Sequence, residues 1–279
     1  MKRKKNAVLI SILVVSALVL VAAIGYLIFE MINIMSAKNE NDALAASFAG
    51  NLGDEDYTGH LQNNGPTTPE QIDHTVAERV TNIDNPVSFE ELRAINPDVY
   101  AWIYIPDTNI NYPVLQSPSD DNFYLSHNVY KSYSFPGAIY SQKSYNKTDW
   151  SDRVTVLYGH NMASGAMFAN LHKFEDKSFF DSHPYIYIYG ENRKLVYQVV
   201  SAYAYDDIHI LNSYDFSDDK VFKSWLEDAK NPHSMNSNVR SGVQLDLKSK
   251  MLVLSTCPNN SSGRFLVQGV LVKDEQTKQ

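Results

Sequence analysis

Cysteine is almost absent from this chain of 279 residues, in which Cys257 is the only one. A single cysteine forms no intramolecular disulfide and supplies no multi-cysteine metal site. Zinc bound by one cysteine and histidines is also disfavoured, because no two histidines have the spacing typical of zinc sites. We therefore predict no metal and no cofactor. Cys257 is left as either a small buried apolar residue or a reactive thiol.

Basic residues are outnumbered, with 24 Lys and Arg against 32 Asp and Glu and a net charge of −8. The one basic cluster is Lys2-Arg3-Lys4-Lys5, at the start of the chain. A nucleic-acid-binding protein normally presents a basic face. The charge balance therefore predicts no nucleic-acid partner.

Charge is missing altogether from residues 7–29. As a helix with a rise of about 1.5 Å per residue, this run would be about 34 Å long, enough to cross a hydrocarbon core of about 30 Å. The alternative is a cleaved signal peptide, but the apolar core of such a peptide usually has only about 7–15 residues. A triplet that resembles a cleavage site, Ala43-Leu44-Ala45, lies well beyond the run. These features favour an uncleaved transmembrane anchor.

The order of charges predicts the orientation of this anchor. The basic cluster precedes the apolar run, and Lys38 is the first basic residue after it. Because positive charge stays on the cytoplasmic side, we expect a single-pass protein with its N-terminus inside and the rest outside. Three parts are expected: a cytoplasmic tip and anchor over 1–30, an extracellular stalk over 31–85, and a globular domain over 86–279. The stalk is poor in apolar residues, with helical stretches expected near 31–46 and 70–81.

Short segments rich in β-branched and aromatic residues dominate the globular part, and turn signals such as Gly190-Glu191-Asn192 separate them. About eight short strands at this spacing predict a mainly β fold, a closed barrel with mostly antiparallel strands. The expected strands cover residues 101–105, 110–114, 138–140, 154–158, 185–189, 194–203, 251–255 and 264–272.

Two helices are predicted to flank the barrel. Ser88, with Glu91 three residues later, fits a capping box, and the helix that follows should end at Asn96. Residues 217–230 place apolar side chains at helical spacing, and Asp218 can cap their N-terminal end. We expect this second helix to pack against the barrel.

Cys257 stands at the end of a predicted strand, before a polar loop over 258–263 and then Arg264 at the start of the last strand. Functional residues favour such loop edges on rigid scaffolds. A cysteine whose role was packing would rather lie inside the apolar run. The position therefore favours a reactive thiol.

His160 has the same placement, directly after the strand predicted over 154–158. The main competitors among the eight histidines are His127, His172 and His183. Position at a strand end favours His160 as the residue that works with the thiol.

Together, Cys257, His160 and Arg264 would supply the groups that acyl transfer needs. A thiol becomes nucleophilic as the thiolate. An imidazole can take that proton and return it to a leaving amine. A guanidinium can stabilise the negative charge that develops on the carbonyl oxygen. For Arg264 the alternative is a surface ion pair with Asp207 or Asp246.

These residues lie in motifs that resemble those of the sortase family. Leu254-Ser255-Thr256-Cys257, with Arg264 in the next strand, is similar to the family's active-site signature. That signature usually reads Thr-Leu-x-Thr-Cys, so Val253 departs from its first position. Tyr158-Gly159-His160-Asn161-Met162 is similar to the histidine motif, and residues 101–106 and 110–114 resemble the first strands. The likeness covers roughly residues 86–273, and the 217–230 helix and the helical lead-in resemble class B.

The resemblance implies an eight-stranded sortase-type β-barrel with Cys257 as nucleophile, His160 as general acid/base and Arg264 as the stabiliser of oxyanion or substrate. It implies a membrane-anchored cysteine transpeptidase of Gram-positive cells. Such an enzyme cleaves a C-terminal sorting motif of surface proteins through a thioacyl intermediate. It then transfers them to an amine, usually of a peptidoglycan precursor. Two alternatives remain: a cysteine peptidase that releases its product to water, and an inactive barrel that binds surface partners.

Overall fold

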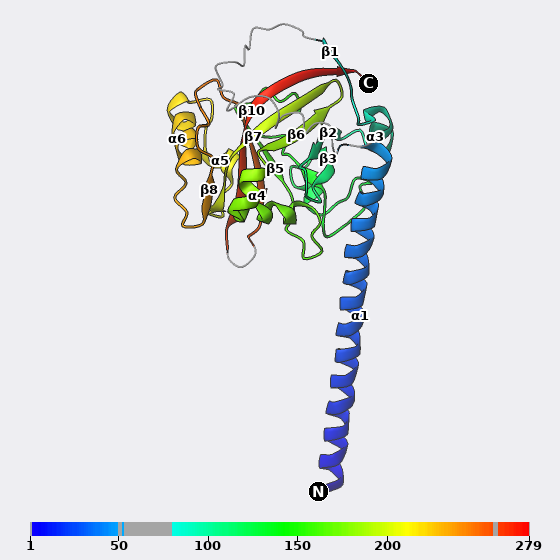
Figure 1. Cartoon of the computed structure of the whole chain (residues 1–279). Coiled ribbons are helices and arrows are strands. Elements are labelled where there is room, and N and C mark those ends of the chain that lie inside the picture. Colours follow the sequence, from blue (N-terminus) through cyan, green and yellow to red (C-terminus); the bar gives the residue numbers. More distant parts are fainter. Residues whose placement is uncertain (1, 50–51, 53–79, 259–261, 279) are drawn as a thin grey trace.

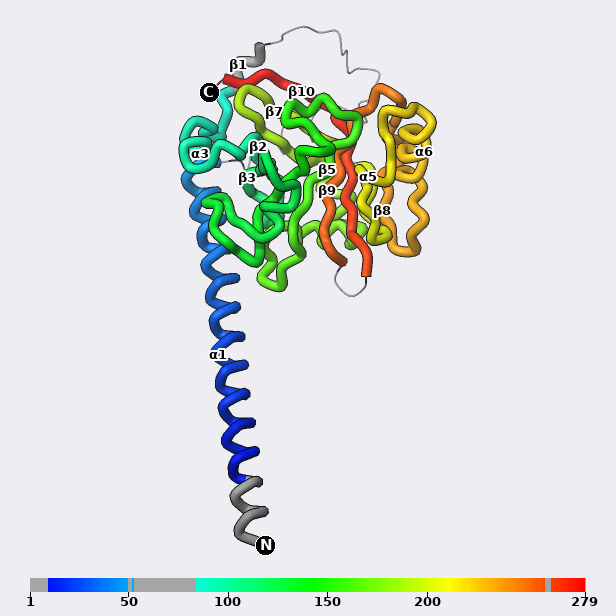
Figure 2. The backbone as a smooth tube through the Cα atoms, turned by 180° about the vertical axis from the view of Figure 1, so that it is seen from behind, coloured from blue at the N-terminus to red at the C-terminus, as the bar shows by residue number. Residues whose placement is uncertain are grey.

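The computed structural model describes residues 2–49, 52, 80–258 and 262–278. A long helix, α1 (Lys2–Phe48), leads from the N-terminus to a β-barrel and lies against one side of it (Figure 1). Seen from behind, the barrel lies between α1 on one side and helix α6 (Asp219–Lys230) on the other (Figure 2).

Eight strands close the barrel in the ring order β10-β9-β5-β4-β3-β2-β6-β7, which is completed by pairing of β7 with β10. The eight segments expected from the sequence each form one of these strands, so the prediction of a closed eight-stranded barrel is confirmed. The ring strands are β2 (Val99–Tyr104), β3 (Asn111–Leu115), β4 (Ile139–Tyr140), β5 (Val154–Tyr158), β6 (Tyr185–Gly190), β7 (Arg193–Tyr205), β9 (Met251–Thr256) and β10 (Arg264–Lys278).

The shorter elements attach to this ring. Strand β1 pairs with β10 and strand β8 pairs with β7, each outside the ring. The bounds are β1 (Val80–Asp84), α3 (Phe89–Ile95), η2 (Phe123–Leu125), η3 (Phe168–Glu175), α4 (Lys177–Ser182), α5 (Ile210–Ser213) and β8 (Ser237–Val239).

Most pairings in the ring are antiparallel, as expected, but β3 pairs with β4 and β5 pairs with β9 in parallel. Parallel partners need a long crossover connection, and here it runs from β5 through β6, β7 and α6 before the chain returns as β9. Both β5 and β9 therefore end at the same end of the barrel, which positions the site described below.

Strand β9 separates two apolar layers, because successive side chains of a strand point to opposite faces. Leu254 packs inside the barrel with Phe265. Val253 packs on the outer face with Phe222 and Trp225 of α6. The expected packing of this helix against the barrel is confirmed.

The two predicted flanking helices are present. The side chain of Asp218 accepts hydrogen bonds from the backbone of the first turn of α6, as predicted. Helix α3 ends at Asn96, also as predicted. Ser88 is its N-cap residue, but its side chain makes no capping hydrogen bond, so the predicted capping box is wrong. Packing holds this short helix instead, because Phe89 and Leu92 are fully buried.

The described part of the predicted stalk differs from a free linker. Residues 31–48 continue α1 without a break. Leu44, Ala49 and Leu52 are buried in the same cluster as residues of the barrel. Ala37 is also buried, and it lies seven residues before Leu44, on the same face of the helix. A few small apolar residues thus dock this segment onto the barrel.

The other end of the predicted stalk forms a strand. The helical stretch expected over 70–81 falls mostly on residues 70–79, which lie outside the described residues. Its last two residues belong to β1, which pairs in parallel with the C-terminal part of β10. Asn85 N then donates to Lys278 O at 2.6 Å, so the chain enters the barrel beside its own C-terminal strand.

Candidate active site

Strand register brings the three predicted site residues to one end of the barrel. In the parallel pair of β5 and β9, Tyr158 lies opposite Ser255. The two strands thus end side by side, and Asn161, which follows His160, donates from its Nδ2 to Cys257 O at 3.2 Å. Phe265 of β10 lies opposite Thr256, so Arg264 flanks Cys257 on its other side. Neighbouring strands are about 4.8 Å apart, and residues at one register level point to the same face.

Two glycines fix the backbone next to these residues. Gly159 precedes His160, and a Cβ there would lie 2.5 Å from Ile139 Cδ1 and 2.8 Å from the Phe168 ring. Gly263 precedes Arg264 and has φ +119°, in the region that favours glycine. The close packing at Gly159 and the positive φ at Gly263 therefore both require glycine.

Arg264 contacts the sulfur of Cys257 directly. Its Nη1 donates to Cys257 Sγ at 3.3 Å, and its Nη2 forms an ion pair with Asp207 Oδ1 at 2.8 Å. Asp246 instead accepts hydrogen bonds from Ser249 and the Lys248 backbone. The alternative ion pair with Asp207 is therefore present together with the sulfur contact, and it holds one side of the guanidinium fork.

His160 is held by η2 and the loop that follows it. Its Nε2 lies 2.8 Å from Leu125 O, and its ring stacks on Phe135 with centroids 5.7 Å apart. A carbonyl oxygen only accepts, so Nε2 carries the hydrogen in this contact. In the neutral ring Nδ1 is then the nitrogen that can take a proton.

His172 is one of the predicted competitors of His160, and the fold brings it to the backbone of Cys257. His172 Nε2 lies 3.0 Å from Cys257 O, and its Nδ1 lies 2.5 Å from Glu175 Oε1. The ring is stacked on Phe265 with centroids 4.7 Å apart. Asn161 Nδ2 donates to the same carbonyl oxygen at 3.2 Å. The backbone of the nucleophile position is thus held by two side chains.

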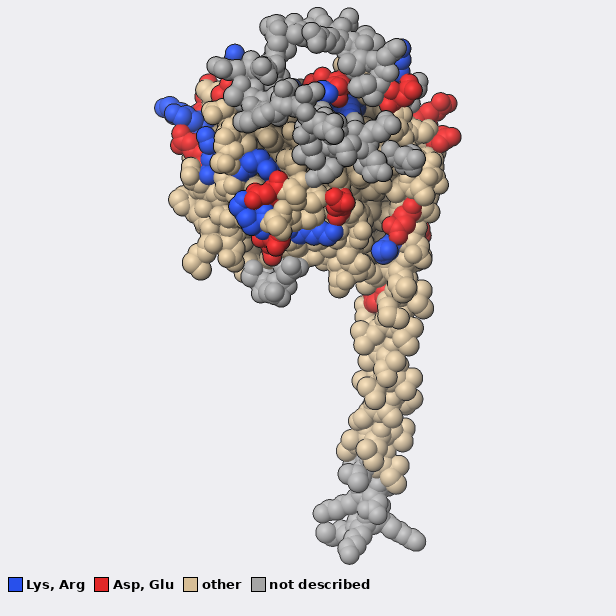
Figure 3. Space-filling model, in the orientation of Figure 1, with Lys and Arg blue, Asp and Glu red and all other residues tan. Residues whose placement is uncertain are grey.

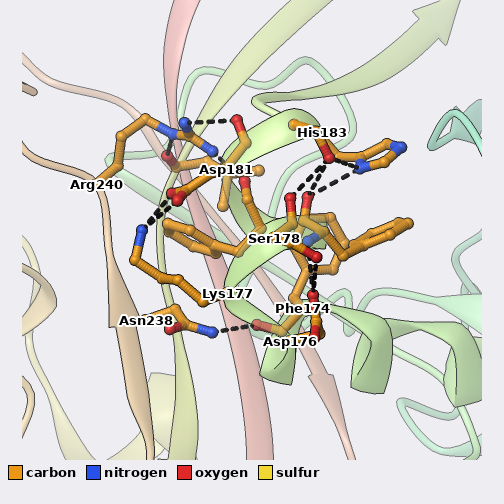
Figure 4. A network of polar contacts seen from close by, with 12 residues as sticks. Phe174, Asp176, Lys177, Ser178, Asp181, His183, Asn238 and Arg240 are labelled. Carbon is orange, nitrogen blue, oxygen red and sulfur yellow. Dashed lines mark hydrogen bonds and ion pairs between the residues drawn. The ribbon is translucent and has the colours of Figure 1, made fainter.

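His183 belongs to a structural network around α4 and β8. Figure 4 shows it at the end of α4, where Arg240 donates to backbone oxygens of Phe180 and Asp181. Asn238 Nδ2 donates to Phe174 O at 2.8 Å in the same network. His183 Nε2 pairs with Asp107 at 2.9 Å. These contacts tie η3 and α4 to β8, and so support the element that carries His172.

His127 also makes a structural contact. Its ring stacks on Phe123 with centroids 4.0 Å apart, and its Nδ1 lies 2.8 Å from Phe123 O. Of the four candidate histidines, His160 included, only His172 has a described contact with Cys257.

Tyr140 and Tyr158 lie near the guanidinium of Arg264. Burial raises the pKa of Tyr140 to about 12, and Arg264 acts in the opposite direction. Burial likewise raises the pKa of Tyr158, again opposed by Arg264. Both phenols therefore stay neutral in the physiological range. Their rings, 5.5 Å apart, give the site an uncharged aromatic wall.

A cavity of about 560 Å³ opens between residues 144–146, 151–154, 211–212 and 214–217. It lies beside Val154 at the start of β5, whereas His160 follows the end of that strand. Cys257 and Arg264 do not line it. The reactive groups thus lie on the exposed end of the barrel, where Cys257 is exposed.

Comparison with known proteins identifies the family of this chain. Residues 103–272 match the model of the sortase domain, and the matched segment contains Cys257, His160 and Arg264. The chain belongs to the sortase family. It is 34% identical to sortase B of Listeria monocytogenes over 212 residues, which cover 71% of this chain and 80% of the relative. Sortase B of Staphylococcus aureus is 29% identical over 188 residues, with 66% and 75% covered.

Solved structures agree with the sortase assignment. The crystal structure of Clostridium perfringens sortase B matches with a TM-score of 0.60 and 32% identity, and covers 67% of this chain and 100% of that one. Bacillus anthracis sortase B, solved in complex with AAEK1, matches with a TM-score of 0.59 and 30% identity, with 70% and 88% covered. This sortase therefore has a sortase B-like domain and is a cysteine transpeptidase by family, and the resemblance to class B is confirmed.

Proposed function

We propose that this sortase is a membrane-anchored transpeptidase that cleaves a C-terminal sorting motif of surface proteins and transfers them to a cell-wall amine. The contact of Arg264 Nη1 with Cys257 Sγ, at the barrel end where register also brings His160, carries the proposal. In this assignment Cys257 is the nucleophile, His160 is the general acid/base and Arg264 stabilises the oxyanion.

The first half of the reaction forms a thioester. The Cys257 sulfur, as thiolate, attacks the carbonyl carbon of the scissile peptide bond, and a carbon–sulfur bond forms. The carbon–nitrogen bond breaks, and the imidazolium of His160 gives its proton to the departing nitrogen. The acyl part of the substrate then remains on sulfur.

The second half transfers the acyl group to an amine. The amine nitrogen attacks the thioester carbon while His160 takes a proton from that nitrogen. The carbon–sulfur bond breaks and the thiolate returns. In both halves negative charge passes through the carbonyl oxygen, where the planar fork of Arg264 can donate. Asp207 on its Nη2 keeps the fork directed toward the sulfur.

Helix α1 supports the membrane part of the proposal. Within the described residues it is the one helix long and apolar enough to cross a membrane, by length and composition, a test that a signal sequence also passes. The surface of its part below the barrel is almost free of charged side chains (Figure 3). The candidate cleavage triplet lies inside α1, where Leu44 is buried against the barrel. A peptidase would have to unwind a docked helix to reach it.

Capture by an amine distinguishes a transpeptidase from a peptidase. With a library of sorting peptides and added amines, we expect mass spectrometry to show peptide–amine products in place of the hydrolysed acid. Triglycine is a suitable first amine because a sortase B has been solved in complex with this tripeptide. If water remains the acceptor at saturating amine for every peptide that is cleaved, the enzyme is a hydrolase and the proposal fails.

Arg264→Lys is expected to lower kcat at least about tenfold with little change in the thermal midpoint, because lysine keeps the charge and loses the planar fork. Steady-state kinetics with a sorting peptide and thermal unfolding measure the two effects. Asp207→Asn is the matched control, since it removes the ion pair and leaves the guanidinium. If Arg264→Lys and Arg264→Ala both raise KM while kcat holds, Arg264 binds the peptide and does not stabilise the oxyanion.

A further inference from the structure

One loop of the barrel carries a concentration of exposed aromatic and apolar side chains. We define the aromatic loop as residues 123–136, from η2 toward β4. Its exposed members are Leu125 at 44%, Tyr130 at 49%, Tyr133 at 75% and Phe135 at 50%. Among the described side chains of residues 84–258 and 262–278, eight large hydrophobic ones are exposed, so this loop holds half of them. Such clustering on a soluble surface marks an interaction site.

Hydrogen bonds hold the loop in one conformation. Asn128 N donates to Ser132 O at 2.9 Å, and Ser134 N donates to Ser126 O at 2.9 Å. The side chain of Asn128 accepts from the backbone of Tyr130 and Ser132. The tip that presents Tyr130 and Tyr133 is therefore preformed, and docking it orders little additional chain.

The aromatic loop lies beside α1. Asn128 Nδ2 donates to Glu40 Oε2 of α1 at 3.1 Å. Tyr133 lies near Tyr26 of α1, which in turn lies near Glu30, one turn farther along the helix. Tyr133 thus reaches the level of α1 at which its uncharged stretch meets its first acidic residue.

The barrel begins close to the end of the uncharged run of α1. Phe29 is the last residue of the uncharged run, and Ile34 already packs against the barrel core. Five residues of helix rise by only about 7.5 Å. The headgroup region on each side of a bilayer is about 5–8 Å thick. If α1 spans a membrane, no room for a free stalk exists between the lipid and the barrel.

The end of the barrel that carries the active site faces the N-terminal part of α1. In Figures 1 and 2 the end of β9 and the start of β10 lie at the edge of the barrel from which the N-terminal part of α1 extends. The aromatic loop also holds His160, through Leu125 O and the Phe135 ring. The surface next to the catalytic groups is thus the one that approaches the membrane.

We propose that the aromatic loop docks into the outer interface of the lipid bilayer, with Tyr130 and Tyr133 at headgroup level. The proposal rests on the proposed anchoring by α1. Tyrosine suits this position because its ring is apolar and its hydroxyl is wet, and tyrosine is enriched at membrane interfaces. The continuity of the loop with the apolar surface of α1 favours lipid over a second copy of the chain as occupant. Docking holds the catalytic end against the membrane, within reach of substrates at its surface.

Tryptophan placed at position 133 tests the docking in the full chain. The native Trp102, Trp150 and Trp225 are at most 4% exposed, so they give a nearly constant background. In phosphatidylcholine vesicles with brominated acyl chains, Tyr133→Trp is expected to emit at shorter wavelength than in detergent and to lose emission to the bromines. Tyr130→Trp provides a second position in case the first variant does not fold.

Leu247→Trp is the matched control. Leu247 is also exposed, at 40%, and it precedes the start of β9, at the end of the barrel opposite the active site. Its added tryptophan should keep the same emission with and without bromine. Dilution with more lipid should leave the quenching at position 133 unchanged. A blue shift without bromine quenching, which reverts when more lipid separates the chains, would assign the loop to a second copy of the chain and overturn the proposal.

Two further measurements separate docking of the aromatic loop from anchoring by α1 and from transpeptidase activity. Resistance to alkaline extraction from the vesicles reports the anchor, and turnover of a soluble sorting peptide reports the active site. If the chain is retained and active while positions 130 and 133 are unquenched, docking is wrong and the anchored transpeptidase stands. If alkali releases the full-length chain, both the anchor and the docking are wrong.

Discussion

Cys257→Ala is expected to abolish turnover of every sorting peptide. The thioester requires a thiol, and the chain contains no other cysteine that could replace this one. Cys257 is exposed and packs in none of the apolar clusters of the described chain. The substitution should therefore leave the thermal midpoint nearly unchanged. The loss of activity then reports the loss of the nucleophile and not unfolding of the protein.

Peptide cleavage followed by chromatography measures this loss, and intact-mass spectrometry of the wild type should show a transient acyl adduct that the variant lacks. Iodoacetamide should modify the wild type once and block it. Residual turnover within about tenfold of the wild type would rule out Cys257 as nucleophile. A thiol that resists mild alkylation would favour the inactive, surface-binding barrel.

Local pattern was sufficient to predict the eight ring strands, because β-branched and aromatic residues mark strands and turn residues separate them. It was not sufficient to predict their partners. Nothing in residues 154–158 or 251–255 indicates that these two strands pair in parallel across about 100 intervening residues. That pairing places the segment of His160 and the segment of Cys257 at the same end of the barrel, so the sequence could propose both residues but not this shared position.

His172 shows the same limit at the level of one side chain. It lies 85 positions from Cys257 in the chain, within η3, and only the packing of η3 against the end of β9 makes the contact. The one local signal was Glu175, three residues later on the same face, which now binds its Nδ1. A histidine–carboxylate pair at helical spacing is common on surfaces, so it could not be assigned to the site in advance.

The docked part of α1 was missed for a different reason. Few apolar residues follow residue 36, and low apolar content predicts a linker. Ala37 and Leu44 lie on one face, however, and a narrow stripe is enough when the barrel supplies the other half of the contact. Burial of this kind depends on a partner surface that composition does not show.

His160→Ala is expected to lower kcat by about 10²–10⁴-fold, the usual contribution of general acid–base catalysis. The parallel pairing of β5 and β9 puts the segments of His160 and Cys257 at one end of the barrel, and donation from His160 Nε2 to Leu125 O leaves Nδ1 to exchange the proton. His160→Gln should be nearly as damaging, because an amide keeps a donor for Leu125 O but cannot transfer a proton in this range.

Two other histidines serve as controls for this loss. His233 has a side chain that is 95% exposed, and His183 pairs with Asp107 away from the thiol, so His233→Ala and His183→Ala should keep kcat near the wild-type value. His172 is the informative comparison, because it lies 3.0 Å from Cys257 O and holds that carbonyl from the side of η3. Its removal should loosen the nucleophile without removing the proton carrier, so His172→Ala should cost less than His160→Ala in single-turnover cleavage of the same peptide. If His172→Ala lowers the rate of peptide cleavage more than His160→Ala does, His172 is the proton carrier and the assignment of this role to His160 is wrong.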